Sequence, residues 1–440
     1  MKFRRWASSV AFMVLLCFVS AEAEVYDLDK CIQTALENNY GVISSRNAYD
    51  AARWNVWPGY GRILPRISIS VDRNRSWFPM TQSTYYINGI PFTSSEGGAR
   101  INYGSDLNIG QSFTGLGLGL YADIRQKHAQ KKYYYYGHID AQRNLVLGVK
   151  EAYFNVVKAR LLVDVAREAV KRGEEQLKVA QTRYELGSAS FSDVLKARVL
   201  RSNAKVDLVT AENNLNLAKS NLNYILGVEI SRDIEVTEDF HEPELQITYD
   251  GALAEALRNN AEFLRTKYDL EIAKMNLLSA KAQFLPAISF NLRYSNAADK
   301  FDELMKFRGS NSSSGFGVAL SYSIFNNFSD MAGWIAQRKL VNTQKRGLVD
   351  RENAVALEVK QEFLNVQQAR EKLALNRESV AAAQEDLNIV KEKYNLGAAT
   401  IIEVLDAEVS FKQAQVGQVQ ALFEYNLAIS RLEKAMGRQE

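Results

Sequence analysis

Two long stretches of the chain repeat a bulky and a small apolar position every seven residues. The bulky positions of the first stretch are Val149, Val156, Val163, Val170, Leu177 and Tyr184, and the small ones are Ala152, Ala159, Ala166, Gly173, Ala180 and Gly187. The second stretch has bulky residues at Val359, Val366, Leu373, Val380, Leu387 and Tyr394. Such a four–three spacing predicts helices in left-handed coiled coils, and the small positions let a neighbouring helix approach closely.

Both periodic stretches end at a Leu-Gly pair. From about Tyr121 to Leu186 the pattern is unbroken, which predicts a helix of roughly 95 Å. Glycine after the last periodic residue is a helix C-terminal signal, and Ser192 or Asp193 is expected to open the next helix. The segments that follow keep alanine every seven residues, at Ala197, Ala204, Ala211 and Ala218, and at Ala407, Ala414, Ala421, Ala428 and Ala435. Each stretch therefore predicts a long antiparallel helical hairpin, which five or six strict heptads favour over an ordinary bundle core.

Four short segments alternate with period two and predict β-strands of about nine residues, long enough to cross a bilayer when tilted. Their apolar positions are Ile67, Ile69 and Val71; Leu107, Ile109 and Phe113; Ile288, Phe290, Leu292 and Tyr294; and Phe316, Val318, Leu320, Tyr322 and Ile324. The polar stretches Arg73–Asp106 and Asn296–Gly315 lie between them and are predicted to be hairpin loops. Shorter helices, Asp27–Gly61 and Tyr249–Phe284, are predicted before each strand pair.

The opposite positions of these strands are nearly all small or polar, and aromatic residues gather near the strand ends. A half-buried soluble sheet has the same alternation, but a polar interior with aromatic girdles favours a membrane barrel. Four strands are too few to close a conducting barrel, so several chains must share it.

The two halves of the chain are copies of each other. Ala35, Leu36, Asn38 and Asn39 recur at an offset of 221, as do Leu64-Pro65 and Ile67-Ser68. The hairpin tips recur at an offset of 210, so copy one holds eleven more residues between Ser68 and Lys150. A duplication whose length difference is confined to one zone identifies that zone as a loop.

The amino terminus predicts export. Lys2, Arg4 and Arg5 precede the apolar run Ala11–Val19, and Ala21-Glu22-Ala23 has the small-x-small pattern of a cleavage site. We therefore predict a signal peptide over residues 1–23, since the run is too short for a membrane anchor and Leu16 before Cys17 is too bulky for a lipoprotein signal. No later run is long and apolar enough for a transmembrane helix, so the chain would enter a membrane as strands.

The remaining chain carries 51 basic and 50 acidic residues, and this balance does not indicate a nucleic-acid partner. Cys31 is the only cysteine after the signal, so no internal disulfide forms. An enzyme is not expected, because His128, His138 and His241 are scattered and no phosphate-binding loop follows a strand. We predict no catalytic, cofactor-binding or metal-binding residues. The alternative function is a periplasmic coiled-coil adaptor or structural protein without a pore.

The ordered, duplicated set of elements resembles the TolC-like outer-membrane efflux protein family (outer membrane factors) from Tyr26 to Gly437. Each tip carries Tyr-x-Leu-Gly and, after five intervening residues, Asp or Glu before Val-Leu. The resemblance implies an α plus membrane β-barrel fold: each chain gives four strands to a trimeric 12-stranded barrel, and its helices to a periplasmic tunnel. The expected parts are the first repeat (24–226, with its β-hairpin at 66–118), a linker or equatorial segment (227–248), and the second repeat (249–440, with its β-hairpin at 287–325).

By the same resemblance, the protein is expected to be a homotrimer in outer-membrane lipid of a Gram-negative cell. It would be the exit duct of a tripartite efflux pump or type I secretion system, with a periplasmic adaptor (membrane fusion protein) and an inner-membrane transporter as partners. The sequence identifies no substrate.

The resemblance also assigns roles at the tips. Leu186-Gly187 and Leu396-Gly397 correspond to the adaptor-docking motif. Glu403 and Asp406 correspond to acidic residues at the periplasmic entrance, where six carboxylates of a trimer would favour cations. Asp193 and Tyr394 match two members of an Asp–Tyr–Arg network that holds the entrance shut, but Ala399 stands where the arginine is expected. Either another basic residue replaces it, or the tip opens more easily.

Overall fold

The computed structural model describes residues 24–237, 247–304 and 312–438. The predicted signal peptide, residues 1–23, lies outside the described residues, as does His241. The chain divides into two compact units, and each unit takes segments from both repeats. Their described parts are residues 24–43, 141–237, 247–254 and 358–438 for unit 1, and residues 44–140, 255–304 and 312–357 for unit 2.

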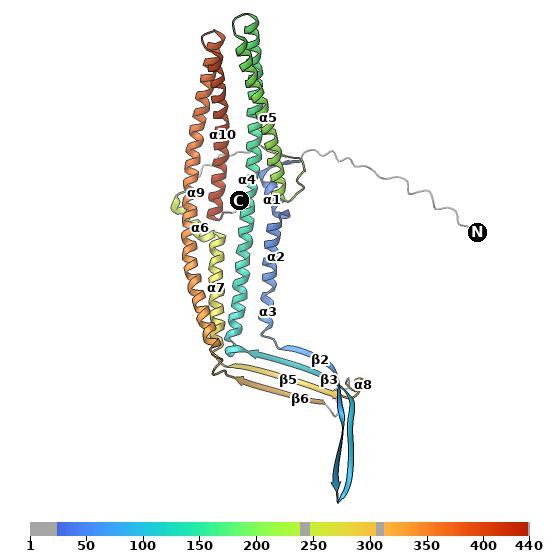
Figure 1. The fold of residues 1–440 in the computed structure, drawn as a ribbon. Helices are drawn as coiled ribbons and strands as arrows, with labels where there is room; N and C mark the ends of the chain where they lie inside the picture. The colour runs from blue at the N-terminus through green and yellow to red at the C-terminus, as the bar shows by residue number, and fades with distance from the viewer. Residues whose placement is uncertain (1–23, 238–246, 305–311, 439–440) are drawn as a thin grey trace, which may run out of the picture. The chain divides into compact units, whose positions relative to one another are not determined.

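Long helices dominate the chain, as the heptads predict (Figure 1). The four longest are α4 (Leu118–Glu185), α5 (Phe191–Leu226), α9 (Ser329–Asn395) and α10 (Ile401–Met436). Helix α4 starts three residues before the expected Tyr121 and ends one residue before Leu186. Unit 1 contains α5, α10, the adjoining parts of α4 and α9, α1 (Leu28–Asn38) and the first half of α6 (Tyr249–Asn259). In the described ranges, no helix is both long and apolar enough to cross a membrane.

The bulky and small positions pack as coiled coils do. Val149, Val156 and Val163 are at most 4% exposed, and Ala152 and Ala180 are at most 3% exposed. A Cβ atom on Gly173 would lie 3.2 Å from the Cα of Arg201, so this position brings the backbones of α4 and α5 close together. The small register therefore lets the two helices of a hairpin approach each other.

The shorter helices differ from the prediction, because each is broken at an asparagine of the repeated motif. Asp27–Gly61 divides at Asn39 into α1 and α2 (Tyr40–Trp54), and at Asn55 before α3 (Val56–Gly61). Tyr249–Phe284 divides at Asn260 into α6 and α7 (Ala261–Ala282). Asn260 adopts an extended backbone and its side chain accepts a hydrogen bond from the N–H of Phe263, which starts a new helix. The apolar residues keep a helical period on both sides of each break, so the sequence pattern alone does not show it.

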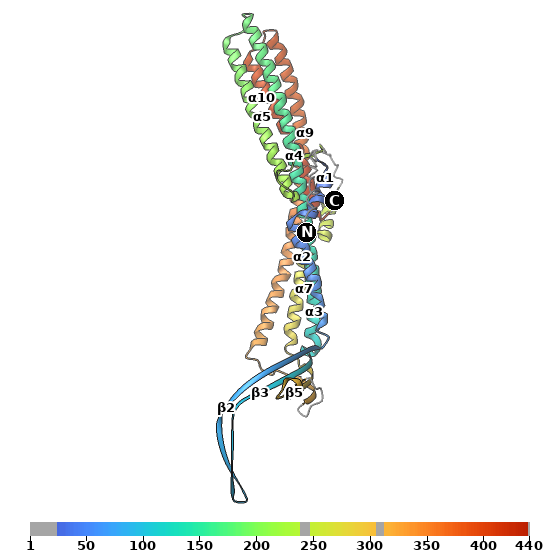
Figure 2. The same ribbon diagram turned by 90° about the vertical axis from the view of Figure 1, so that its right-hand side faces the viewer.

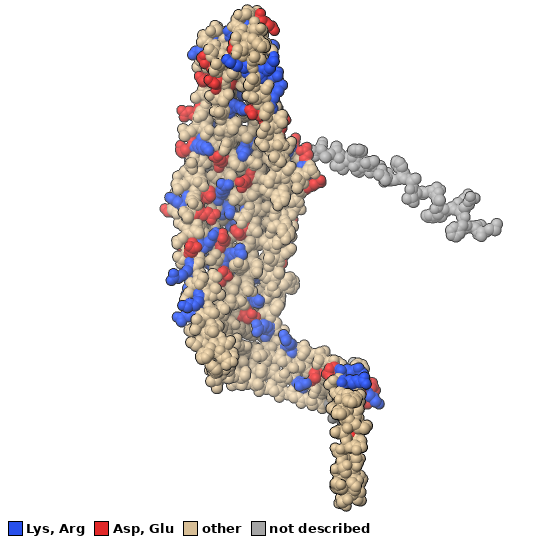
Figure 3. Space-filling model, in the orientation of Figure 1, with Lys and Arg blue, Asp and Glu red and all other residues tan. Residues whose placement is uncertain are grey.

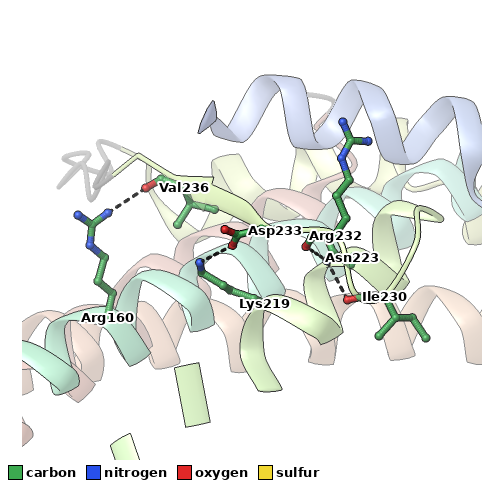
Figure 4. A network of polar contacts seen from close by, with 7 residues as sticks. All are labelled: Arg160, Lys219, Asn223, Ile230, Arg232, Asp233 and Val236. Carbon is green, nitrogen blue, oxygen red and sulfur yellow. Dashed lines mark hydrogen bonds and ion pairs between the residues drawn. The ribbon is translucent and has the colours of Figure 1, made fainter. Parts of the chain in front are cut away.

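A small parallel sheet joins the start of the chain to the segment after α5. It pairs β1 (Glu24–Tyr26) with β4 (Ile234–Val236). The buried Asn223 of α5 donates to the carbonyl oxygens of Ile230 and Arg232, at 3.1 and 2.7 Å (Figure 4). The thiol of Cys31 is buried in the same core, and burial raises its pKa to about 12. These contacts fix the segment between the repeats on the helices of unit 1.

Unit 2 contains an antiparallel sheet of order β2-β3-β5-β6 (Figure 1), with α7 and the remaining parts of α4 and α9; Figure 2 shows β2 and β3 extending together beyond the rest of the sheet. Its strands are β2 (Arg66–Ile87), β3 (Ile90–Phe113), β5 (Ala287–Ala298) and β6 (Ser312–Ser321). A 3-10 turn (η1, Thr114–Gly117) precedes α4, and a one-turn helix, α8 (Phe301–Leu304), follows β5.

The loop predicted over Arg73–Asp106 is wrong. The register of β2 and β3 continues from Arg66↔Gly110 up to Ile87↔Ile90, whereas the pairing of β3 with β5 stops at Tyr103↔Ala298. Residues 74–102 therefore form a two-stranded extension of the sheet, which we call the arm. Its two-residue turn, Asn88-Gly89, has positive φ at both residues, as a type I′ turn requires.

Candidate functional site: the hairpin tips

Both hairpin tips end their first helix in the same way. Gly187 and Gly397 adopt left-handed φ values of 72° and 78°. At the first tip, the N–H groups of Gly187 and Ser188 donate to the carbonyls of Tyr184 and Arg183, and the second tip repeats the pattern. This pair of hydrogen bonds is the Schellman motif. The motif requires a residue with a left-handed backbone, which explains the two glycines structurally. What the tips present to solvent is leucine, since Leu186 and Leu396 are 77% and 85% exposed.

The return helices open with capping boxes. Ser190 and Thr400 are the N-caps, and their hydroxyls accept from the N–H groups of Asp193 and Glu403. The two carboxylates accept in return, Asp193 from the Ser190 N–H at 3.1 Å and Glu403 from the Thr400 N–H at 3.0 Å. Hydrogen bonds from the backbone and side chain of Thr400 hold the pKa of Glu403 below its usual value. The helix therefore opens at Ser190 and not at Ser192 or Asp193, the residues expected from the sequence. Asp193 is the third helical residue, and both acidic residues have a local structural role in the capping boxes.

The two hairpins of unit 1 meet at Tyr394. Its ring is 5% exposed, and the guanidinium of Arg183 lies 4.6 Å from the ring centroid. An Nη1 hydrogen of Arg183 also donates to the Tyr394 carbonyl. Burial raises the pKa of the Tyr394 phenol; the Arg183 charge lowers it and the Asp193 charge raises it. Tyr394 is therefore in contact with a basic residue, Arg183 of copy one, whereas Asp193 influences it through its charge and forms its hydrogen bonds with Ser190.

Sequence reasoning missed Arg183, although the repeat held a signal for it. Lys393 stands at the equivalent position of copy two, so a basic residue precedes each tip. Ala399 lies half-buried against the apolar cluster of Tyr394, Ile401 and Val404. Asp406 is exposed one turn after Glu403, and among the described residues it forms no side-chain hydrogen bond or ion pair.

A second link between the hairpins is buried further along the helices. Glu408 of α10 is 6% exposed and pairs with two cations. Its carboxylate lies 2.9 Å from Nε of Arg172 on α4 and 2.6 Å from Nζ of Lys391 on α9. The Arg172 guanidinium also lies 5.2 Å from the ring centroid of Phe411. One carboxylate thus joins three helices from both repeats.

In unit 2, the sheet has one polar face. Asn291 donates to the side chain of Asn108 at 3.2 Å, and Arg293 pairs with Asp106 at 2.6 Å. The alternate positions on the other face carry exposed apolar residues, among them Ile69 and Phe316. Within the described parts of the chain, no group of three His, Cys, Asp or Glu side chains is placed to hold a metal ion.

The outer membrane efflux protein family model matches residues 31–228 and 252–438, which are both repeats. The chain belongs to this family. Among its relatives, outer membrane protein TolC of Vibrio cholerae is 23% identical over 98% of this chain and 94% of its own length. Alkaline protease secretion protein AprF of Pseudomonas aeruginosa is 21% identical, over 90% and 82% of the two chains.

Solved structures of similar fold include the CmeC outer membrane channel of Campylobacter jejuni, with a TM-score of 0.80 at 17% identity over 93% of this chain and 85% of its own. The structure of VceC of Vibrio cholerae has a TM-score of 0.79 at 17% identity, over 93% of this chain and 96% of its own. The predicted fold class is confirmed. As a member of the outer membrane efflux protein family, the chain is an outer-membrane exit duct for efflux or secretion and not an enzyme, which rejects the pore-free adaptor.

Proposed function

We propose that the duct is a homotrimer that works with a periplasmic adaptor and an inner-membrane transporter. The observation that carries the proposal is the sheet of unit 2. Its edge strands, β2 and β6, each pair with one neighbour among the described strands, and its two faces differ in polarity. Three such sheets joined edge to edge give twelve strands, which close around a lumen that four strands cannot form. The polar face with Asn108 and Arg293 then lines the lumen.

The tips form the closed entrance in this proposal. Arg183 and Tyr394 fasten the two hairpins of one chain to each other, and Asp193 lies at the same place. Arg183 replaces the arginine that the family network has at the position of Ala399. The Glu403 carboxylate accepts hydrogen bonds from Thr400 at the start of α10. Asp406 is therefore the carboxylate that remains available to passing ions.

Replacement Asp406→Asn is expected to lower the cation preference of the purified channel. Three carboxylates disappear from the entrance of the trimer, whereas Glu403→Gln changes a group that is already hydrogen-bonded and should have the smaller effect on selectivity. The reversal potential in a planar bilayer under a salt gradient measures the preference. An unchanged reversal potential in Asp406→Asn removes this residue from the entrance, and absence of channels in the wild-type protein removes the proposed function.

The double replacement Leu186→Ser with Leu396→Ser is expected to reduce adaptor binding at least tenfold. Burying a leucine contributes about 1.5–3 kcal/mol, and each chain offers two exposed leucines on intact glycine turns. Site-specific cross-linking of the duct to the adaptor in cells measures the contact. Leu217→Ser, at a 61% exposed position along α5, is the control. Equal cross-linking in the tip variant and this control excludes the leucines from docking.

A further inference from the structure

The arm, residues 74–102, carries a long uncharged surface. From Ser76 to Ser95 there is no Asp, Glu, Lys or Arg, whereas Arg75, Glu96 and Arg100 lie immediately beside this segment. Figure 3 shows the arm as an almost uniformly uncharged surface beyond a band of charged side chains. A two-stranded hairpin is at best marginally stable in water, and exposed strand edges are usually protected by charges or coverage. The composition of the arm therefore indicates a covered surface.

Near its turn, one face of the arm gathers four large apolar side chains, whereas Tyr86 and, nearer the sheet, Trp77 lie on the opposite face. The pairs Ile87↔Ile90 and Tyr85↔Phe92 share a face, and the rings of Tyr85 and Phe92 stack with centroids 6.3 Å apart. These four residues are each 47–59% exposed. At roughly 200 Å² for a large apolar side chain, their exposed parts amount to on the order of 400 Å². Phe78 lies on the same face, but the pairs Thr81↔Glu96 and Ser83↔Ser94 separate it from them. An apolar patch of that size is often functional.

The register shows on which side of the sheet this face lies. A bulge between Phe78 and Thr81 adds one residue to β2, so that Tyr85 and Ile87 move to the face of the even-numbered residues of β3. That face carries Phe92 in the arm and Asp106 and Asn108 in the sheet. The apolar face of the arm is thus the continuation of the polar face that lines the proposed lumen.

We propose that the arms of the three subunits pack against one another through this apolar face, forming a collar at the outer opening. The inference rests on the proposed homotrimer, which places three copies of the same face around one axis. The occupant is a second copy and not a lipid surface, for two reasons. Anionic headgroups attract Lys and Arg, which are absent from Ser76–Ser95. Lipid tails also offer no partners for the unpaired backbone groups of the arm edges, whereas another arm does.

Single-cysteine cross-linking of the full-length protein in intact cells tests the collar. Ser83→Cys places a thiol on the apolar face, and Thr84→Cys places one on the opposite face. Cys31 is buried with a pKa of about 12, so it does not react. With a short bismaleimide, Ser83→Cys is expected to give at least five times more cross-linked dimer than Thr84→Cys.

A second pair of variants separates packing from mere proximity. In the Ser83→Cys background, Tyr85→Lys with Phe92→Lys is expected to abolish the cross-link, because charges enter the apolar contact. Thr84→Lys with Thr93→Lys changes the opposite face and should leave the cross-link in place.

Three results overturn the collar. Equal cross-linking of both cysteines, or none, in a protein whose unheated samples still migrate as trimers, rejects the collar and leaves the proposed function intact. Labelling of Ser83→Cys by a membrane-dissolved reagent, without cross-linking, assigns the face to lipid instead. A wild-type protein that forms no trimer removes both the collar and the proposed function.

Discussion

Replacement Arg183→Ala is expected to raise the mean conductance of the purified channel several-fold, because the channel is open for a larger fraction of the time. The change removes a charged donor to the Tyr394 carbonyl and the guanidinium over its ring. A hydrogen bond from a charged group contributes about 1.5–3 kcal/mol and a cation–π contact about 0.5–2 kcal/mol. A loss of about 1.4 kcal/mol in each subunit shifts the closed-to-open equilibrium about tenfold per subunit. Conductance at fixed voltage in a planar bilayer measures the result.

Two matched variants sharpen this test. Arg167→Ala removes an arginine of the same helix that pairs only with the exposed Asp164 one turn away, and its conductance should equal that of the wild type. Arg183→Lys keeps the charge but loses the planar group over the ring, so we expect an intermediate conductance. If Arg183→Ala conducts like Arg167→Ala, the tip is not held by this contact.

Replacement Glu408→Ala is expected to destabilise the helical unit by about 3 kcal/mol, because breaking a buried ion pair leaves its cations uncompensated. The side chains of Arg172 and Lys391 are 15% and 33% exposed. Water can therefore solvate the unpaired charge of the arginine less well than that of the lysine. The midpoint of guanidinium unfolding, followed by helical circular dichroism, should fall in Glu408→Ala and fall less in Glu408→Gln. Glu174→Ala breaks a pair with Lys205 that is about half exposed on both sides and should change little. Equal midpoints for the two alanine variants contradict a structural role of the buried carboxylate.

Sequence reasoning succeeded where one physical signal repeats over many residues. The heptads of α4 and the Leu-Gly ends of the tips predicted the long hairpins within a few residues, because coiled-coil packing leaves its period in the sequence. It failed in the arm, where Ser and Thr fill both faces and the alternation is weak. Asn88-Gly89, the strongest short hairpin signal, was present there and identifies the turn.

The tip shows a different limit. Asp193 and Tyr394 were identified through the family, and the structure brings Arg183, from the same repeat as Asp193, to Tyr394 of the other repeat. Which side chains of two packed hairpins meet depends on how the helices supercoil around each other, and one sequence does not record that. The breaks at Asn39 and Asn260 escaped for a related reason, since an asparagine cap competes with a helix without disturbing the apolar period beside it.

The two ion pairs that join α4 to α10 have a consequence for assembly. Arg172 pairs with Glu408, and Lys150 pairs with Glu433 at 3.0 Å. The repeat-equivalent positions of the two glutamates hold Arg198 and Asn223, so neither carboxylate recurs in copy one. In a threefold tunnel the equivalent contact lies between neighbouring chains, and it has no counterpart of these pairs. In the proposed trimer these ion pairs therefore join the two hairpins within each chain, whereas the contacts between chains lack them.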